Sequence, residues 1–129
     1  MVKLKIKRLF FLGVTFKPNT DDMRDSTSLS MIPYVAKRGA NVFYYEPTGQ
    51  KKEFNNIKNC KYSEKIFDIC KNADLIILHT EWDEFKSLDF KKLAKSNKFK
   101  VYDLRNLYSF DEMKKRKIKY YSIGRPSTI

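Results

Sequence analysis

The sequence holds few of the residues from which metal sites and disulfide frameworks are built. Its 129 residues include two cysteines and a single histidine, His79. Structural zinc sites need about four ligands, mostly cysteine and histidine, so the sequence does not favour a metal site. Cys60 and Cys70 stand ten positions apart without a CxxC spacing. We therefore expect two free thiols, with a single disulfide as the less favoured alternative.

Glycine and proline are also scarce, with four residues of each. Together with an aromatic content of 15%, this composition is typical of an ordered globular domain. No apolar run approaches the roughly 20 residues of a membrane-spanning helix. The basic and apolar stretch at residues 1–14 lacks a small-residue cleavage site, so it is interpreted as a first strand and not as a signal peptide. The sequence thus predicts one cytoplasmic domain over residues 1–129.

Charge is the strongest feature of the composition. Lysine and arginine number 27 against 15 acidic residues, which gives a net charge of +12 at pH 7. Such a balance favours anionic partners, either nucleic acid or a small ligand that carries phosphate. The basic residues are spread along the chain, and no zinc finger, helix-turn-helix or aromatic RNA-binding signature accompanies them. A solvated, lysine-rich surface is therefore the favoured interpretation, and nucleic-acid binding is the weaker one.

Apolar runs alternate with segments of helical periodicity along the sequence. Ser26 is the expected N-cap of the first helix, Gly39 its C-terminal stop, and Pro33 inside it predicts a kink. The pattern as a whole predicts strands at residues 8–16, 41–45, 74–80, 100–104 and 119–123, and helices at residues 27–38, 63–72, 85–95 and 110–116. This alternation indicates an α/β fold of the Rossmann-like, doubly wound kind, with a mainly parallel sheet and helices on both faces.

In such sheets ligands bind beyond the carboxyl ends of the strands, so the loops there hold the candidate site. The first of these loops does not follow the GxGxxG pattern, because Gly13 is its single glycine. We therefore expect a mononucleotide diphosphate as the ligand instead of a dinucleotide, with Lys17 near a phosphate or a sugar hydroxyl. Arg105, directly after the strand at residues 100–104, suits a bidentate contact with a pyrophosphate.

Each basic candidate also has a purely structural interpretation. Lys17 has Asp21 and Asp22 as ion-pair partners close in sequence. Arg24 stands among the acids at positions 21, 22 and 25, which favours a local ion-pair network. For Arg105 the alternative partner is Asp103. From position alone, the ligand and structural interpretations stay open for all three.

No nucleophile and general base can be paired in the sequence. His79 stands at the end of a strand, where a hydrogen-bonded core histidine is the commoner case. Cys60 is expected in a polar, lysine-rich loop and Cys70 on an apolar helix face, and neither has an activating basic neighbourhood. Trp82 and Phe85 are expected to pack at a helix start. These residues describe a binding module without catalytic residues.

Four blocks of the sequence stand out at residues 11–29 (FLGVTFKPNTDDMRDSTSL), 80–82 (TEW), 103–106 (DLRN) and 123–125 (IGR). In order and spacing they resemble the C-terminal domain of nucleotide-sugar dehydrogenases, the UDP-glucose/GDP-mannose dehydrogenase family. Their wording is most similar to the UDP-glucose branch, the UDP-glucose 6-dehydrogenases. Three positions depart from the pattern: Thr27 stands where a proline is common, Glu46 stands where an aspartate precedes Pro47, and Pro33 interrupts the first helix.

The resemblance implies a part in the oxidation of UDP-glucose to UDP-glucuronate with two NAD+. It assigns the NAD-binding fold and the catalytic cysteine to N-terminal and central regions that this sequence does not contain. We therefore expect the chain to be inactive without an N-terminal dehydrogenase half. By position, Phe16, Lys17 and Arg105 correspond to residues that contact the UDP-sugar, and Arg24 to one that reaches NAD. The alternatives are a non-catalytic nucleotide-sugar-binding remnant or sensor and, less favoured, a nucleic-acid-binding domain.

Overall fold

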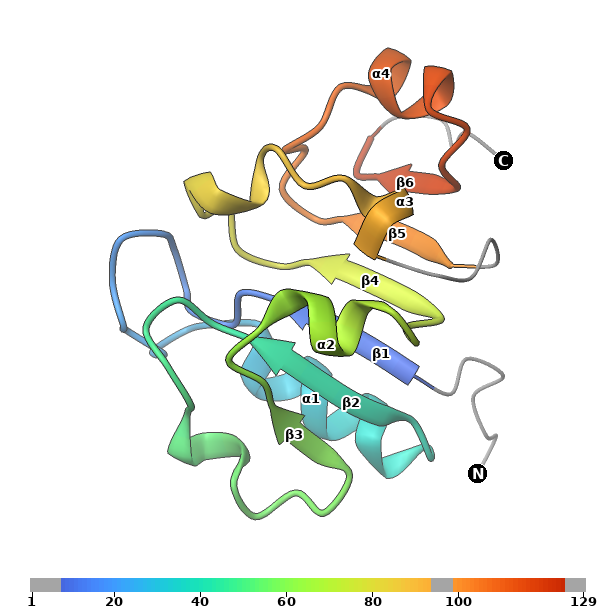
Figure 1. Ribbon diagram of the computed structural model, residues 1–129. Helices are drawn as coiled ribbons and strands as arrows, with labels where there is room; N and C mark the ends of the chain where they lie inside the picture. The colour runs from blue at the N-terminus through green and yellow to red at the C-terminus, as the bar shows by residue number, and fades with distance from the viewer. Residues whose placement is uncertain (1–7, 94–98, 125–129) are drawn as a thin grey trace.

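A sheet of six parallel strands forms the centre of the protein (Figure 1). The computed structural model describes residues 8–93 and 99–124. Its strands are β1 (Arg8–Leu12), β2 (Asn41–Tyr45), β3 (Cys60–Tyr62), β4 (Leu75–Leu78), β5 (Lys100–Asp103) and β6 (Tyr120–Ser122). They lie in the order β3-β2-β1-β4-β5-β6, so the chain runs outward from β1 to β3 and restarts with β4 on the other side of β1. This strand order is that of a doubly wound fold and confirms the predicted fold class.

Helices lie on both faces of the sheet. They are α1 (Ser28–Lys37), α2 (Ile66–Cys70), α3 (Phe90–Leu93) and α4 (Phe110–Lys115), with two short 3₁₀ turns, η1 (Lys52–Phe54) and η2 (Asp83–Phe85). Figure 1 shows α1 behind the sheet and α2 in front of it. None of the helices in the described ranges has the length and apolar character that crossing a membrane requires.

The two faces of the sheet pack into two hydrophobic clusters. In β1, Leu9 and Phe11 belong to the cluster that contains Ile32 of α1, whereas Phe10 and Leu12 belong to the opposite cluster. Because β1 is buried on both faces, its residues form the continuous apolar run from which a strand was predicted. Burying one such side chain contributes roughly 1.5–3 kcal/mol. The central strands therefore give a firm base to the loops that leave their carboxyl ends.

One strand and one helix differ from the sequence-based expectation. Cys60, predicted to lie in a loop, begins β3, which is too short at three residues to show a periodic pattern. The expected helix at residues 85–95 is wrong in its first half, where the chain forms η2 and starts α3 only at Phe90. Phe85 and Phe90 are buried in the same cluster, and five positions span about 140° around an α-helix, so one continuous helix would not bury both. Residues 94 and 95 lie outside the described part of the chain.

The ends of α1 confirm one expected cap and correct the other. Gly39 adopts a φ of +96°, its N–H donates to the carbonyl of Ala36 at 3.1 Å, and the helix stops there as predicted. Ser26 is not the N-cap, because the helix begins two residues later, at Ser28. The Ser26 hydroxyl instead donates to the carbonyl of Val14 at 2.6 Å and so ties the helix start to the loop after β1. Pro33 lies inside α1, and the kink stays a prediction.

Candidate functional site

The candidate site begins where β1 ends, four residues earlier than predicted. Gly13 turns the chain with a φ of +79°, a conformation that glycine adopts without steric cost, and its N–H donates to the carbonyl of Tyr45 at 2.8 Å. The loop then closes on itself, because the N–H of Phe16 donates to the carbonyl of Asp22 at 3.1 Å. Phe16 and Lys17 therefore project from a loop that is anchored at both ends.

Glu46, directly after β2, fixes that loop through hydrogen bonds to its backbone. Its fully buried carboxylate accepts hydrogen bonds from the backbone N–H groups of Val14 at 3.1 Å, Thr15 at 3.3 Å and Thr48 at 2.9 Å. The Thr48 hydroxyl adds a fourth at 2.5 Å. The sequence marked Glu46 only as a departure from the family pattern. The structure shows that it joins the loops after β1 and β2 into one unit.

The TEW block supplies a second link, from β4 to the same loop. The hydroxyl of Thr80 donates to the carbonyl of Thr15 at 2.8 Å. The indole N–H of Trp82 donates to the Thr15 hydroxyl at 3.3 Å. Phe85 is fully buried in the core, so this aromatic packs as expected. Thr80 and Trp82 hold the loop that carries Lys17 in place.

His79 lies between these loops as a buried, neutral side chain. Its Nε2 lies 2.9 Å from the hydroxyl of Thr27, and its Nδ1 lies 2.9 Å from the hydroxyl of Thr80. Burial lowers the pKa of His79 from its usual 6.5 to about 4, and the positive charge of Arg105 adds to this effect. With both ring nitrogens in hydrogen bonds, His79 matches the structural role that the sequence favoured.

This buried imidazole should make the fold sensitive to acid. In the unfolded chain His79 takes up a proton as the pH falls below 6.5, whereas in the folded chain it stays neutral down to about pH 4. The unfolded state thus binds more protons in this window, and folding stability falls with the pH, by about 2 kcal/mol between pH 7 and pH 5. Urea unfolding at both pH values should show this loss in the wild type. A His79→Gln variant should lack that part of it, and equal losses in both proteins would contradict the assignment.

Arg105, after β5, is held by its backbone and by one side of its guanidinium. Its backbone N–H donates to the buried carboxylate of Asp103 at 3.1 Å, which also accepts from the backbone N–H of Tyr108 at 3.0 Å and the hydroxyl of Tyr120 at 2.6 Å. The Nε of Arg105 donates to the carbonyl of His79 at 2.8 Å, and Glu81 lies 4.0 Å from that atom. Asp103 therefore holds the loop and does not pair with the guanidinium. This observation decides against the alternative that the sequence left open.

Lys17 and Arg24 differ in how their charges are compensated. Lys17 is exposed and forms no direct ion pair with Asp21 or Asp22 in the described ranges, although its positive charge still interacts with that of Asp22. Arg24 donates through Nε and Nη2 to both carboxylate oxygens of Asp22, at 3.0 to 3.3 Å. These hydrogen bonds lower the pKa of Asp22. The structure thus bears out the local ion pair expected for Arg24, although 89% of its side chain is exposed.

The structure brings Lys17 and Arg105 to the same edge of the sheet but not into an enclosed pocket. They follow β1 and β5, the two strands that flank β4. Four hollows in residues 8–93 and 99–124 are lined by other residues, and Phe16, Lys17 and Arg105 belong to none of these four. Arg24 lines a separate hollow of about 580 Å³ beside η1. Phe16, Lys17 and Arg105 are all exposed at this edge of the sheet, which we call the ledge.

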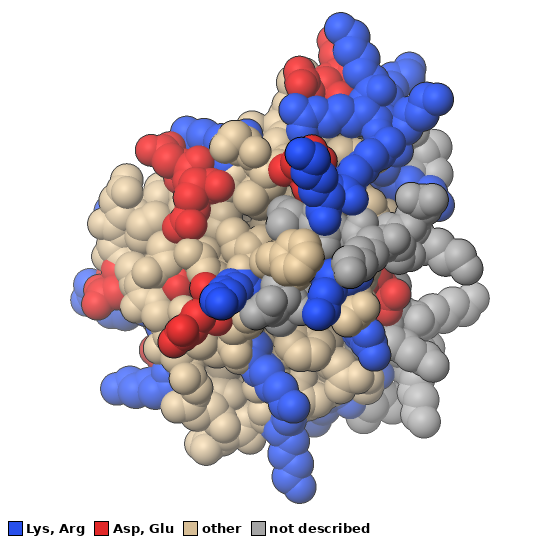
Figure 2. Space-filling model, in the orientation of Figure 1, with Lys and Arg blue, Asp and Glu red and all other residues tan. Residues whose placement is uncertain are grey.

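One group of basic side chains lies over α4, at the upper right of the face that Figure 2 shows. The sequence places four consecutive cations there, at residues 114–117.

Neither cysteine has the properties of a catalytic nucleophile. Both are free thiols, as expected, with Cys70 buried and Cys60 half-buried. Burial raises the pKa of Cys60 to about 12 and also raises that of Cys70. Both thiols are therefore protonated near neutral pH, and the thiolate is the form that attacks an electrophile. In the described part of the chain no three acidic, histidine or cysteine side chains gather as a metal site.

Comparison with known proteins gives concordant matches over most of the chain. The model of the UDP-glucose/GDP-mannose dehydrogenase family, UDP binding domain, matches residues 10–110. The UDP-glucose 6-dehydrogenase of Rhizobium meliloti is 39% identical over 120 residues, which cover 92% of this chain and 28% of that enzyme. The UDP-glucose 6-dehydrogenase TuaD of Bacillus subtilis is 32% identical over 129 residues, which cover 98% of this chain and 28% of that enzyme.

Solved structures agree with this match. A UDP-glucose dehydrogenase from the archaeon Pyrobaculum islandicum superimposes with a TM-score of 0.71 and 26% identity, over 93% of this chain and 26% of that protein. An NDP-N-acetyl-D-galactosaminuronic acid dehydrogenase from Methanosarcina mazei shares the fold with a TM-score of 0.77. The chain spans little more than a quarter of the length of the relatives that it matches.

Proposed function

This chain belongs to the UDP-glucose/GDP-mannose dehydrogenase family through its UDP binding domain, and we propose that it holds the UDP part of UDP-glucose for a UDP-glucose 6-dehydrogenase. The observation that carries the proposal is the anchoring of Arg105. Its Nε is fixed to the carbonyl of His79, while its Nη atoms have no hydrogen bond to any residue in the described ranges. A guanidinium held in this way is oriented in advance for a diphosphate.

The other ledge residues complete the proposed contacts. Lys17 supplies a point charge from the anchored loop after β1, and it forms no direct ion pair in the described residues, although the charge of Asp22 lies within electrostatic reach. The ring of Phe16, 44% exposed, offers apolar surface to the nucleotide-sugar. Arg24 is proposed to reach NAD, and for that contact its ion pair with Asp22 has to open. The ledge binds and orients, and no group on it moves a proton or accepts a hydride.

We further propose that this chain does not form a complete NAD site by itself. The turn after β1 contains one glycine, Gly13, where a dinucleotide-binding turn requires three. NAD supplies the oxidation in the enzymes that carry this domain, and we propose that a partner region of the dehydrogenase binds most of it. The chain alone is then a cytoplasmic substrate-holding part without activity of its own.

Removal of the Lys17 charge tests the ledge. Calorimetric titration with UDP is expected to show about tenfold weaker binding for Lys17→Ala, since a charged hydrogen bond contributes roughly 1.5–3 kcal/mol. Lys37→Ala, which removes the same charge from the exposed last turn of α1, is the matched control and should bind like the wild type. Equal affinity of Lys17→Ala and wild type would take Lys17 out of the site.

A complementation assay tests the enzymatic part of the proposal. The chain mixed with UDP-glucose and NAD+ should produce no NADH absorbance at 340 nm. Addition of the N-terminal part of the R. meliloti relative, which this chain does not cover, should restore NADH formation. UDP binding without any restored activity would instead favour a non-catalytic nucleotide-sugar sensor.

A further inference from the structure

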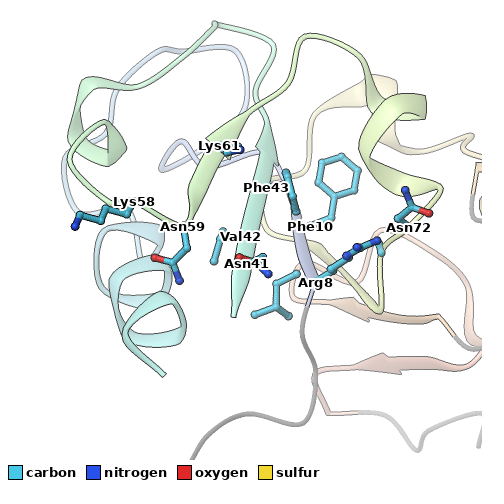
Figure 3. Close-up of a pocket in the computed structure, with 11 residues that line it drawn as sticks. Arg8, Phe10, Asn41, Val42, Phe43, Lys58, Asn59, Lys61 and Asn72 are labelled. Carbon is cyan, nitrogen blue, oxygen red and sulfur yellow. The ribbon is translucent and has the colours of Figure 1, made fainter. Parts of the chain in front are cut away.

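A second hollow, of about 590 Å³, opens at the amino-terminal edge of the sheet, opposite the ledge (Figure 3). Arg8 and Asn41 are the first residues of β1 and β2, Lys58 and Asn59 precede β3, and Asn72 precedes β4. In a parallel sheet all strand starts lie at one edge, so these side chains surround a common space. Small-molecule sites have volumes of roughly 300–1,000 Å³, and this hollow falls within that range.

The floor of the hollow is apolar. Phe10 is buried on one face of the sheet, where Phe43 is half-buried beside it, and Val42 is buried on the opposite face. One wall is fixed by Asn59, whose side-chain N–H group donates to the carbonyls of Ala36 at 2.8 Å and Ala40 at 2.6 Å. These two hydrogen bonds hold the Asn59 side chain in a fixed orientation.

The rim of the hollow is positively charged. Arg8, Lys58 and Lys61 are exposed on it, and the lining contains no aspartate or glutamate. Asp74 lies nearby and accepts a hydrogen bond from the backbone N–H of Arg8 at 3.0 Å, but it does not line the hollow. No ion pair of the three cations exists within residues 8–93 and 99–124, whereas the arginines at 24, 105 and 116 each have an acid within 4.0 Å.

The side chains also point in directions that suit a ligand with a charged part and a flat, apolar part. Figure 3 shows Arg8 extending toward Asn72 along one side of the hollow, and Phe43 rising from its floor near Phe10. Lys61 stands on the side of β3, and Lys58 extends outward from the rim. Two cations thus flank an aromatic ring and exposed amides, within one concave surface.

We propose that this hollow binds a nucleotide-like organic anion, distinct from the UDP-sugar on the ledge. Its phosphate groups contact Arg8, Lys61 adds positive charge from the side of β3, and no acidic lining residue competes for either cation. Its flat ring rests on Phe43, and the side-chain amides of Asn41 and Asn72 offer hydrogen bonds to its edge. The site is a small-molecule pocket, and it needs neither the ledge nor the remainder of the dehydrogenase.

The test is an NMR titration of the ¹⁵N-labelled chain with ADP. Saturable shifts are expected for the backbone amides of Asn41, Lys61 and Asn72. Arg8→Ala/Lys61→Ala should weaken this response at least tenfold. The matched control is Lys114→Ala/Lys115→Ala, which removes the same charge from α4 and should leave the response unchanged. Shifts that do not saturate, or equal losses in both double variants, would overturn the proposal as a general charge effect.

Two further titrations complete the test. One compares the phosphate and ring parts of the ligand, and the other distinguishes the hollow from the ledge. Pyrophosphate and adenosine should each bind more weakly than ADP, and pyrophosphate binding as tightly as ADP would show that the apolar floor takes no part. The Lys17→Ala/Arg105→Ala variant should keep the full response to ADP at the hollow. A failure of UDP to bind at the ledge is then a separate result from a failure of ADP to bind at the hollow.

Discussion

Replacing Gly13 by alanine is expected to lower the free energy of unfolding by about 4 kcal/mol. A Cβ at this position would lie 2.6 Å from the Cβ and 2.9 Å from the Oγ1 of Thr80, closer than packed atoms approach. Thr80 is buried and its hydroxyl is bonded to the carbonyl of Thr15, so it has no room to withdraw. A φ of +79° costs an alanine roughly 1–2 kcal/mol, and overpacking a dense site typically costs 1–3 kcal/mol more.

Gly49 offers the matched control for this variant. It also has a positive φ, of +99°, but a Cβ there would meet nothing within 4 Å. Gly49→Ala should therefore show only the backbone cost, about 1 kcal/mol. Urea unfolding of the three proteins measures both effects. Similar losses for the two variants would mean that the approach of Thr80 to Gly13 is looser in solution than in the structure.

Arg105→Ala is expected to weaken UDP binding by about 100-fold. Two charge-assisted hydrogen bonds from the Nη atoms to a diphosphate are worth about 3 kcal/mol together, and 1.4 kcal/mol corresponds to a factor of ten. Arg105→Lys should recover only part of this loss, because an ammonium group cannot form the bidentate contact. Calorimetry with UDP at fixed ionic strength is the measurement, since the contribution of exposed charges depends on salt.

Arg24→Ala is the control for this loss of charge. Arg24 comes from the same edge of the sheet and is proposed to contact NAD, so its removal should leave UDP affinity unchanged. Thermal unfolding of each variant verifies that the fold is intact, because Arg105 also donates to the carbonyl of His79. Equal loss of UDP affinity in Arg24→Ala and Arg105→Ala would show a general effect of positive charge and contradict the proposed contact.

Five of the six strands were predictable, because each of them contains buried residues, and β3 was missed. β1 and β4 are buried on both faces, so an uninterrupted apolar run marked each of them in the sequence. β3 has three residues, none of them buried, and takes its strand conformation from pairing with β2. Such a strand leaves no hydrophobic pattern by which sequence reasoning could find it. The expected helix at residues 85–95 failed for a related reason, since tertiary burial of both Phe85 and Phe90 overrides local helix preference.

The sequence allowed us to predict which strands the candidate residues follow, but not the hydrogen bonds that hold the loops of the site. Lys17 and Arg105 follow strands, and the strand order alone places them at one edge. The role of Glu46 stayed hidden, because a glutamate before a proline looks like an exposed loop residue, whereas it is fully buried among backbone N–H donors. The partner of Arg105 was equally hidden. Only the folded chain brings the Nε of Arg105 to the carbonyl of His79, while Asp103 binds backbone groups instead.

The outermost strands of the sheet, β3 and β6, have three residues each and pair only with β2 and β5 within the described ranges. An extended peptide laid alongside either of them would find few open backbone groups to bind. The two edge strands therefore offer little backbone for a further strand to pair with. A polypeptide that assembles with it is left to recognise side chains on its faces and loops, where single substitutions can strengthen or abolish the association.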